Sequence, residues 1–125
     1  MAKSKPKLEQ PVPKISATFL HFAEPLLEIL GPAATQRQMQ EPLQLAFTVW
    51  NAVVYADAAG NRYFLDALRD LTGSDQQMAA FVSGLIVRKR SLFGDDHRLI
   101  GEYKLSCQDG EIRLWAEARD PHTPA

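Results

Sequence analysis

Two charged residues of this sequence occupy positions where helical periodicity predicts apolar contacts. At about 100° per residue, Lys89 falls in the middle of the apolar arc of a helix that ends near Phe93, and Asp57 falls inside the apolar arc of an earlier helix. A buried lysine without an acidic partner would lose its charge or cost several kcal/mol. The sequence therefore predicts an ion pair between Lys89 and Asp57 across the helix interface. In the alternative interpretation, Lys89 extends past the rim of the bundle and Asp57 caps a frayed helix end.

Basic residues gather around Lys89, and such a group could bind phosphates. A tryptophan among basic side chains on the outer face of a hairpin could also provide a stacking platform for bases. The candidate nucleic-acid-binding residues are Arg88, Arg90, Arg98, Lys104 and Trp115. Against this use, Glu102 and Glu117 face each other on the same predicted surface. A basic residue near a helix C-terminus also has an ordinary explanation, because it interacts favourably with the helix dipole.

Two short groups hold oxygen and imidazole ligands at spacings that a metal ion could use. They are Asp95, Asp96 and His97 in the loop after the helix of Lys89, and His21, Glu24 and Glu28 on the polar face of the first helix. Neither group has a cysteine pair or a recognised ligand pattern such as His-Glu-x-x-His. They are therefore weak metal candidates, and the sequence predicts neither a metal nor a cofactor.

The residues available for nucleophilic catalysis are few. The serines have no Gly-x-Ser-x-Gly context, and the single cysteine, Cys107, is predicted to face the buried side of a hairpin. The chain has three histidines and no glycine-rich loop of the kind that holds phosphates. The residues therefore give no argument for catalysis, and an enzyme stays open only as a third class of function.

Four helices must position these side chains. Helical periodicity predicts them over residues 15–30, over about 38–58, in a short segment after Asn61, and from a capping box at Ser74–Gln77 to about Phe93. Pro25 is expected to kink the first helix without breaking it, because the apolar stripe stays in phase across it. The apolar arcs of the first and fourth helices include Ile29 and Phe81. The second helix is apolar over more than half of its circumference, which predicts that it is the central one. In the short helix, the predicted buried stripe is Phe64, Leu65, Leu68 and Leu71.

A period of two after Gly94 predicts a C-terminal antiparallel β-hairpin with a two-residue turn at Asp109-Gly110. This turn sets a register that keeps apolar residues opposite one another on one face. The predicted pairs are Cys107 with Ile112, Leu105 with Leu114, Tyr103 with Ala116, and Gly101 with Ala118. On the outer face, the same register places Lys104 opposite Trp115.

The composition, with 46% hydrophobic and 23% charged residues in 125, is typical of one soluble globular domain and excludes a disordered chain, a collagen-like fibre and a disulfide scaffold. Four lysines against one glutamate leave the first 14 residues at +3, so the rest of the chain, whose total charge is −1, stands at −4. We expect a disordered basic tail over 1–14, a single helical domain with a hairpin over 15–119, and a flexible C-terminus over 120–125. Neither a secretory signal nor an apolar run long enough for a bilayer is evident, which predicts a cytoplasmic location.

The predicted fold class is α+β, mostly α, with a four-helix cluster followed by a C-terminal antiparallel β-hairpin. A lone hairpin is marginal in water, so it has to lie on the helices or pair with another chain. The leading functional interpretation is a small, non-catalytic interaction or adaptor domain. It would self-associate or bind a protein through the free edges of the hairpin, as in a two-fold dimer with a continuous four-stranded sheet. The alternative is a nucleic-acid-binding accessory protein that uses the basic cluster 88–98 and Trp115. No membrane partner is expected.

Overall fold

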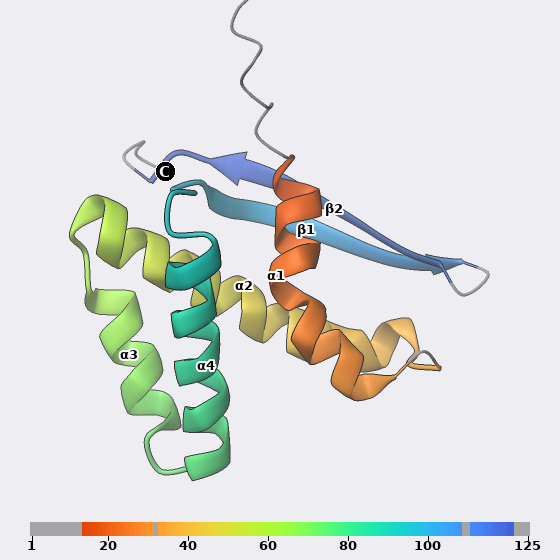
Figure 1. Cartoon of the computed structure of the whole chain (residues 1–125), viewed down its shortest axis with the longest axis horizontal. Helices are drawn as coiled ribbons and strands as arrows, with labels where there is room; N and C mark the ends of the chain where they lie inside the picture. Colours follow the sequence, from red (N-terminus) through yellow and green to blue (C-terminus); the bar gives the residue numbers. More distant parts are fainter. Residues whose placement is uncertain (1–13, 32, 109–110, 122–125) are drawn as a thin grey trace, which may run out of the picture.

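The computed structural model describes residues 14–31, 33–108 and 111–121 of the chain. Its elements are α1 (Ile15–Leu30), α2 (Gln36–Ala59), α3 (Tyr63–Thr72), α4 (Gln76–Leu92), β1 (Leu99–Gln108) and β2 (Glu111–Arg119) (Figure 1). Four helices followed by a two-stranded antiparallel sheet confirm the predicted fold class. The predicted turn at Asp109-Gly110, the basic tail before Lys14 and the end of the chain after Pro121 lie outside the described residues.

Helix α2 is the central helix, as its apolar circumference predicted. It packs against α1, α3, α4 and β1. Trp50, near its middle, has no solvent-exposed surface, and its ring contacts those of Phe22 and Phe93 with centroids 5.3 Å and 5.7 Å away. Because neighbouring elements cover α2 on several sides, an apolar residue on almost any of its faces is buried.

Side-chain caps decide where two of the helices begin. Thr35 and Gln38 form a capping box at α2, in which each side chain accepts a hydrogen bond from the other residue's backbone N–H, so this helix begins two residues earlier than predicted. The capping box predicted from Ser74 is wrong. Asp75, the next residue, is the N-cap of α4, and its carboxylate accepts from the backbone N–H of Met78 at 3.0 Å.

The buried stripe of α3 is narrower than predicted. Leu65 and Leu68 are buried, whereas Phe64 is 44% exposed and Leu71 is 81% exposed. Helix α3 packs on α2 and α4 at the edge of the bundle, so only one line of residues, which continues to Thr72, is covered. A helix at an edge buries less of its apolar surface than periodicity alone suggests.

Three of the four predicted hairpin pairs are confirmed. They are Cys107 with Ile112, Leu105 with Leu114, and Tyr103 with Ala116. Lys104 lies opposite Trp115, and Glu102 lies opposite Glu117, as the predicted register required. The hairpin is held on the helical part of the chain through contacts of β1 with α2 and of β2 with α1.

The fourth predicted pair, Gly101 with Ala118, is wrong because Ala118 pairs with Ile100 and the register shifts at Gly101. This bulge inserts one extra residue into β1. The bulge shifts the alternation, so Ile100 is buried on the side of the core, and Leu99 at the start of the strand is buried as well. The side chain of Arg119 lies against Gly101 where a Cβ would collide with it, so the bulge position suits glycine.

Candidate functional site

The side chain of Lys89 is buried beneath the end of α4. It is 2% exposed, and its Nζ donates to the carbonyl oxygens of Phe93 at 2.7 Å and Asp96 at 2.8 Å. The same ammonium lies 4.4 Å from the centroid of the Trp50 ring. Burial lowers the pKa of Lys89, and the negative charges of Asp96 and Asp57 oppose part of that shift. Lys89 therefore fastens the loop between α4 and β1 to the core.

Asp57 binds Arg90 and not Lys89. Arg90 Nε and Nη2 each donate to one carboxylate oxygen of Asp57 at 2.9 Å, and this hydrogen bonding is the main cause of the lowered pKa of Asp57. The predicted Lys89–Asp57 pair is therefore wrong, and so is the alternative in which Lys89 reaches solvent. The planar fork of a guanidinium matches both carboxylate oxygens, so Arg90 takes the acid while Lys89 takes neutral carbonyls deeper in the fold.

Arg88 donates to two carbonyl groups of α1, one of which Pro25 leaves without its helical donor. Proline has no backbone N–H, so the carbonyl of His21 loses its helical donor. Arg88 Nη2 donates to this carbonyl at 2.7 Å, and Arg88 Nε donates to the carbonyl of Phe22 at 3.0 Å. Arg88 thereby ties α4 to α1 at the point where an acceptor would otherwise lack a partner.

Arg98 binds the carboxylate of Asp96 through two hydrogen bonds, of 2.6 Å from Nη2 and 2.9 Å from Nε. Burial raises the pKa of Asp96, but the hydrogen bonds and the positive charge of Arg98 lower the pKa by more than burial raises it, so the net shift is downward. The carbonyl of Arg98 accepts from Trp50 Nε1 at 2.7 Å. Asp96 is thus committed to Arg98, while Asp95 and His97 are exposed beside it. Within the described part of the chain, no three metal-binding side chains are grouped.

Trp115 is 48% exposed on the outer face of the hairpin, and Lys104 Nζ lies 5.6 Å from its ring centroid. Arg113 and Arg119 flank it on β2, but each pairs with the glutamate two residues earlier, at 3.1 Å and 3.2 Å. Of the five residues predicted to bind nucleic acid, the three arginines make hydrogen bonds within the chain, and Lys104 lies against Trp115. These five side chains therefore do not form one continuous basic surface whose charges are all available to a ligand.

Amide side chains of α2 cover the outer edge of β1. Asn51 donates to the carbonyl of Ile100 at 2.9 Å and accepts from its N–H at 2.8 Å. Gln36 donates to the carbonyl of Leu105 at 2.9 Å and accepts from the N–H of Cys107 at 3.3 Å. Each primary amide therefore pairs with the strand edge as the backbone of a neighbouring strand would.

The edge of β2 is covered at one end. Ser16 Oγ accepts from the N–H of Ala116 at 2.8 Å and donates to its carbonyl at 3.3 Å. Outward-facing backbone groups alternate along an antiparallel strand, so those of Ile112 and Leu114 face outward as well. No hydrogen bond from the described residues reaches these groups on the outer side. Side chains of α1 and α2 therefore cover part of each edge, so the edges available to another chain are shorter than the two free edges predicted.

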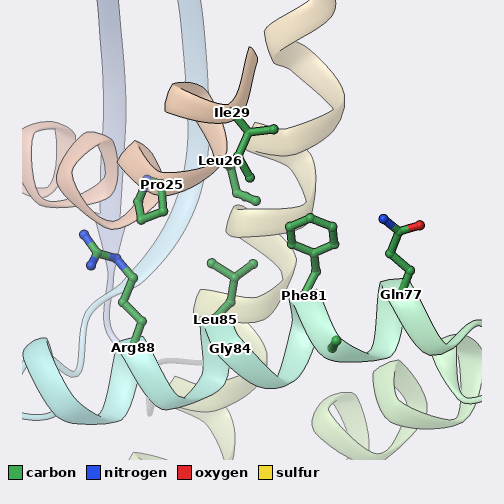
Figure 2. A pocket seen from close by; sticks show the side chains of 9 residues that line it. Pro25, Leu26, Ile29, Gln77, Phe81, Gly84, Leu85 and Arg88 are labelled. Atoms are coloured by element: carbon green, nitrogen blue, oxygen red, sulfur yellow. The ribbon is translucent and has the colours of Figure 1, made fainter. Parts of the chain in front are cut away.

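An apolar groove of about 520 Å³ lies between α1 and α4 (Figure 2). Helix α1 contributes Pro25, Leu26 and Ile29, and α4 contributes the face that runs from Gln77 to Arg88. Both helices pack on α2, but they diverge as they leave the hairpin (Figure 1). The divergence leaves the facing sides of the two helices uncovered. Ile29 is consequently 67% exposed and Phe81 is 38% exposed, although both belong to apolar arcs that periodicity predicts to be buried.

The groove was not predicted, because helical periodicity places Ile29 and Phe81 on apolar arcs that are expected to be buried. One signal could have located it, namely Gly84 in the interior of α4. Glycine inside a helix costs roughly 1 kcal/mol relative to alanine. A glycine there also leaves the helix surface beside it without a side chain.

No family model matches the sequence, and comparisons with curated proteins and with solved structures found no significant similarity. Within the described ranges, no helix combines the length and apolar character needed to cross a membrane.

Proposed function

We propose that this chain is a non-catalytic protein-interaction domain that binds one helix of a partner protein in the groove between α1 and α4. The observation that carries the proposal is the exposure of Ile29 and Phe81 on the two facing walls of the groove. Contiguous exposed apolar surface is typical of interaction sites. A helix that lays its apolar face into such a groove is a recurring mode of protein recognition.

Gly84 supports this use of the groove. Apart from its chain neighbours and the backbone of α4 itself, no atom lies within 4 Å of the position that its Cβ would occupy, so packing against other described residues does not require a glycine there. The helix nevertheless bears the conformational cost of the glycine. Ala80 lies one turn earlier and also lines the groove, and together the two small residues let a partner backbone approach α4 closely.

The dimensions and chemistry of the groove suit a helix. The lining residues of α4 span Gln77 to Arg88, which corresponds to about 16 Å at 1.5 Å per residue, or three turns of a partner helix. The walls are helices whose backbone groups are hydrogen-bonded internally. They therefore offer side-chain packing and not the backbone pairing that an added strand needs.

The other two predicted surfaces have less to offer a partner. The β2 edge is interrupted at Ala116, whose backbone groups bond to Ser16, so it does not offer the unbroken row of backbone groups that the continuous four-stranded sheet of the predicted dimer needs. The nucleic-acid alternative relies on a cluster in which the guanidinium groups of Arg90 and Arg98 are already paired with the carboxylates of Asp57 and Asp96. Self-association and nucleic-acid binding remain proposals that the contacts favour less than the groove.

The test fills the groove and leaves the fold intact. Gly84→Leu places a side chain in open space and replaces glycine with a stronger helix former, so the variant should be as stable as the wild type or more stable by up to about 1 kcal/mol. Ser83→Leu adds the same side chain at the preceding residue, which is exposed and does not line the groove. It is the matched control for a new surface leucine.

A phage-displayed library of helical peptides would be selected on the wild-type protein, and the selected peptides would be titrated against all three proteins. We expect helices with an apolar stripe that bind the wild type and Ser83→Leu equally and bind Gly84→Leu at least about tenfold more weakly, since the added leucine occupies the site. Peptides that do not distinguish Gly84→Leu from the other two proteins would contradict the proposal. A selection that yields no helical binder would contradict it as well.

A further inference from the structure

Arg88 lies at one end of the groove, and its guanidinium binds backbone carbonyls of another helix. It is half-buried, and its hydrogen-bond acceptors are the neutral carbonyls of His21 and Phe22. Five arginines of the described residues lie within 3.4 Å of a carboxylate oxygen, namely Arg62, Arg90, Arg98, Arg113 and Arg119. Of the other three, Arg37 and Arg69 are exposed and do not line the groove, so Arg88 is the half-buried arginine that no carboxylate of the described residues pairs with. Its positive charge therefore stands next to the apolar walls of the groove without an anionic partner.

The Arg88 guanidinium has unused donors and a defined position. An arginine has five N–H groups, and the bonds to α1 use one on Nε and one on Nη2. Those two bonds hold the group beside Pro25, at the end of the row formed by Arg88, Leu85, Phe81 and Gln77 (Figure 2). A donor that is already held in place loses little conformational entropy when it binds a ligand.

Arg88 is the one charged side chain among the described residues that line the groove, and it lies at one end of it. Glu24 and Glu28 are exposed on α1, but neither lines the groove. A partner helix with one carboxylate therefore places it against Arg88 in one orientation and against uncharged walls in the reverse one.

We propose that the partner helix carries an aspartate or glutamate that binds Arg88, and that this carboxylate sets the direction of the helix in the groove. This inference rests on the function proposed above and names the chemistry of the partner. Hydrogen bonds between a guanidinium and a carboxylate are stronger than those between neutral groups, and their strength increases where apolar walls exclude water. The apolar stripe of the partner helix buries apolar surface in the groove, and its single carboxylate fixes where along the groove and in which direction the helix binds.

A scan with one carboxylate tests the proposal. The probe is the tightest peptide of the selection, capped at both ends, with every charged residue replaced by glutamine. One glutamate is then placed in turn at each position that flanks the apolar stripe, and Kd is measured by fluorescence anisotropy at low salt and at high salt. We expect one position near one end of the peptide to bind at least about tenfold more tightly than the all-glutamine peptide. That gain should shrink at high salt, although burial limits the screening.

Two measurements link the gain to Arg88. It should disappear in Arg88→Gln. Because that variant also loses the bonds to α1 and can fail to fold, the Nε–H resonance of Arg88 in the wild-type protein provides a second readout. The resonance should shift with the best glutamate peptide and stay unchanged with the all-glutamine peptide.

The outcomes separate this inference from the proposed function. If the all-glutamine peptide binds and is sensitive to Gly84→Leu, but no glutamate improves it, the carboxylate inference is overturned and the proposed function stands. If none of the peptides distinguishes Gly84→Leu from the wild type, the proposed function itself fails. A gain that persists unchanged in a folded Arg88→Gln protein also overturns the inference, because the carboxylate would then bind elsewhere.

Discussion

Replacing Lys89 with methionine separates the charge of this buried side chain from its packing. Methionine is unbranched and flexible, so it can fill most of the same space beside Trp50. It cannot donate to the carbonyls of Phe93 and Asp96, which accept from the ammonium at 2.7 Å and 2.8 Å. The substitution therefore removes the bonds that hold the loop between α4 and β1 and retains the apolar contacts of the side chain.

The expected magnitude follows from these contacts. Each hydrogen bond from a charged group contributes about 1.5–3 kcal/mol, and a cation 4.4 Å from the Trp50 ring contributes about 1–2 kcal/mol. The gross loss is therefore about 4–8 kcal/mol. The variant no longer has to dehydrate an ammonium, and that gain offsets several kcal/mol of the loss. We expect the free energy of unfolding of Lys89→Met to fall by about 2–4 kcal/mol, because the carbonyl of Asp96 loses its donor and the carbonyl of Phe93 keeps only the backbone N–H of Asp96.

Urea unfolding followed by far-UV circular dichroism measures this difference. Val87→Met is the matched control, since Val87 is 63% exposed on the same helix, and its free energy of unfolding should change by no more than about 0.5 kcal/mol. A Lys89→Met protein as stable as the wild type would refute the reasoning. It would show that the cost of burying the ammonium cancels everything that its bonds contribute.

The lowered pKa of Lys89 also predicts how this difference varies with pH. Between the lowered pKa and the ordinary value of 10.5, the unfolded chain binds more protons at this site than the folded chain. Stability contributed by this site therefore rises with pH across that window. Tyr103 acts in the opposite direction above pH 10, because burial raises its pKa and the folded state keeps that proton longer. We expect the stability of the wild type relative to Lys89→Met to increase as the pH approaches 10.5, and a flat difference would contradict the lowered pKa.

Three further substitutions test other parts of the structure, each by urea unfolding. Trp50→Ala should cost about 3–5 kcal/mol, because it truncates the largest side chain of the core, and an unchanged stability would show that α2 is not central. Trp115→Ala should stay within about 1 kcal/mol of the wild type, since the ring is exposed, and an unfolded variant would mean that the faces of the hairpin are misassigned. Asn51→Leu should cost about 2–4 kcal/mol, because it leaves both backbone groups of Ile100 without partners, and no loss would indicate that another group replaces the amide.

Local sequence patterns predicted the elements of the fold well. Helical and two-residue periods located four helices and two strands, and the position of the turn set the register of three hairpin pairs. These features depend on residues that are close together in the chain, so a local pattern contains the information. The start of α4 was less predictable, because Ser74 and Asp75 are both good N-cap residues and only the folded loop selects between them.

The candidate site was predictable in part. Periodicity marked Lys89 and Asp57 as charged residues on apolar arcs, and burial of Lys89 bears out that signal. Its partners could not be predicted, because they are carbonyls of a loop whose path depends on how β1 docks against α2. Pro25 leaves the carbonyl of His21 without a helical donor, but nothing local in the sequence indicates that Arg88, in another helix, supplies one.

By itself, the sequence determined the order and type of the elements, the central position of α2 and the outward placement of Trp115. Only the tertiary structure decided which apolar side chains remain exposed. Ile29 and Phe81 lie on apolar arcs, yet each is uncovered because α1 and α4 diverge after packing on α2. Periodicity identifies the face that a helix can bury, whereas burial itself depends on the distance and angle between helices that are far apart in the chain. The groove is a product of that geometry.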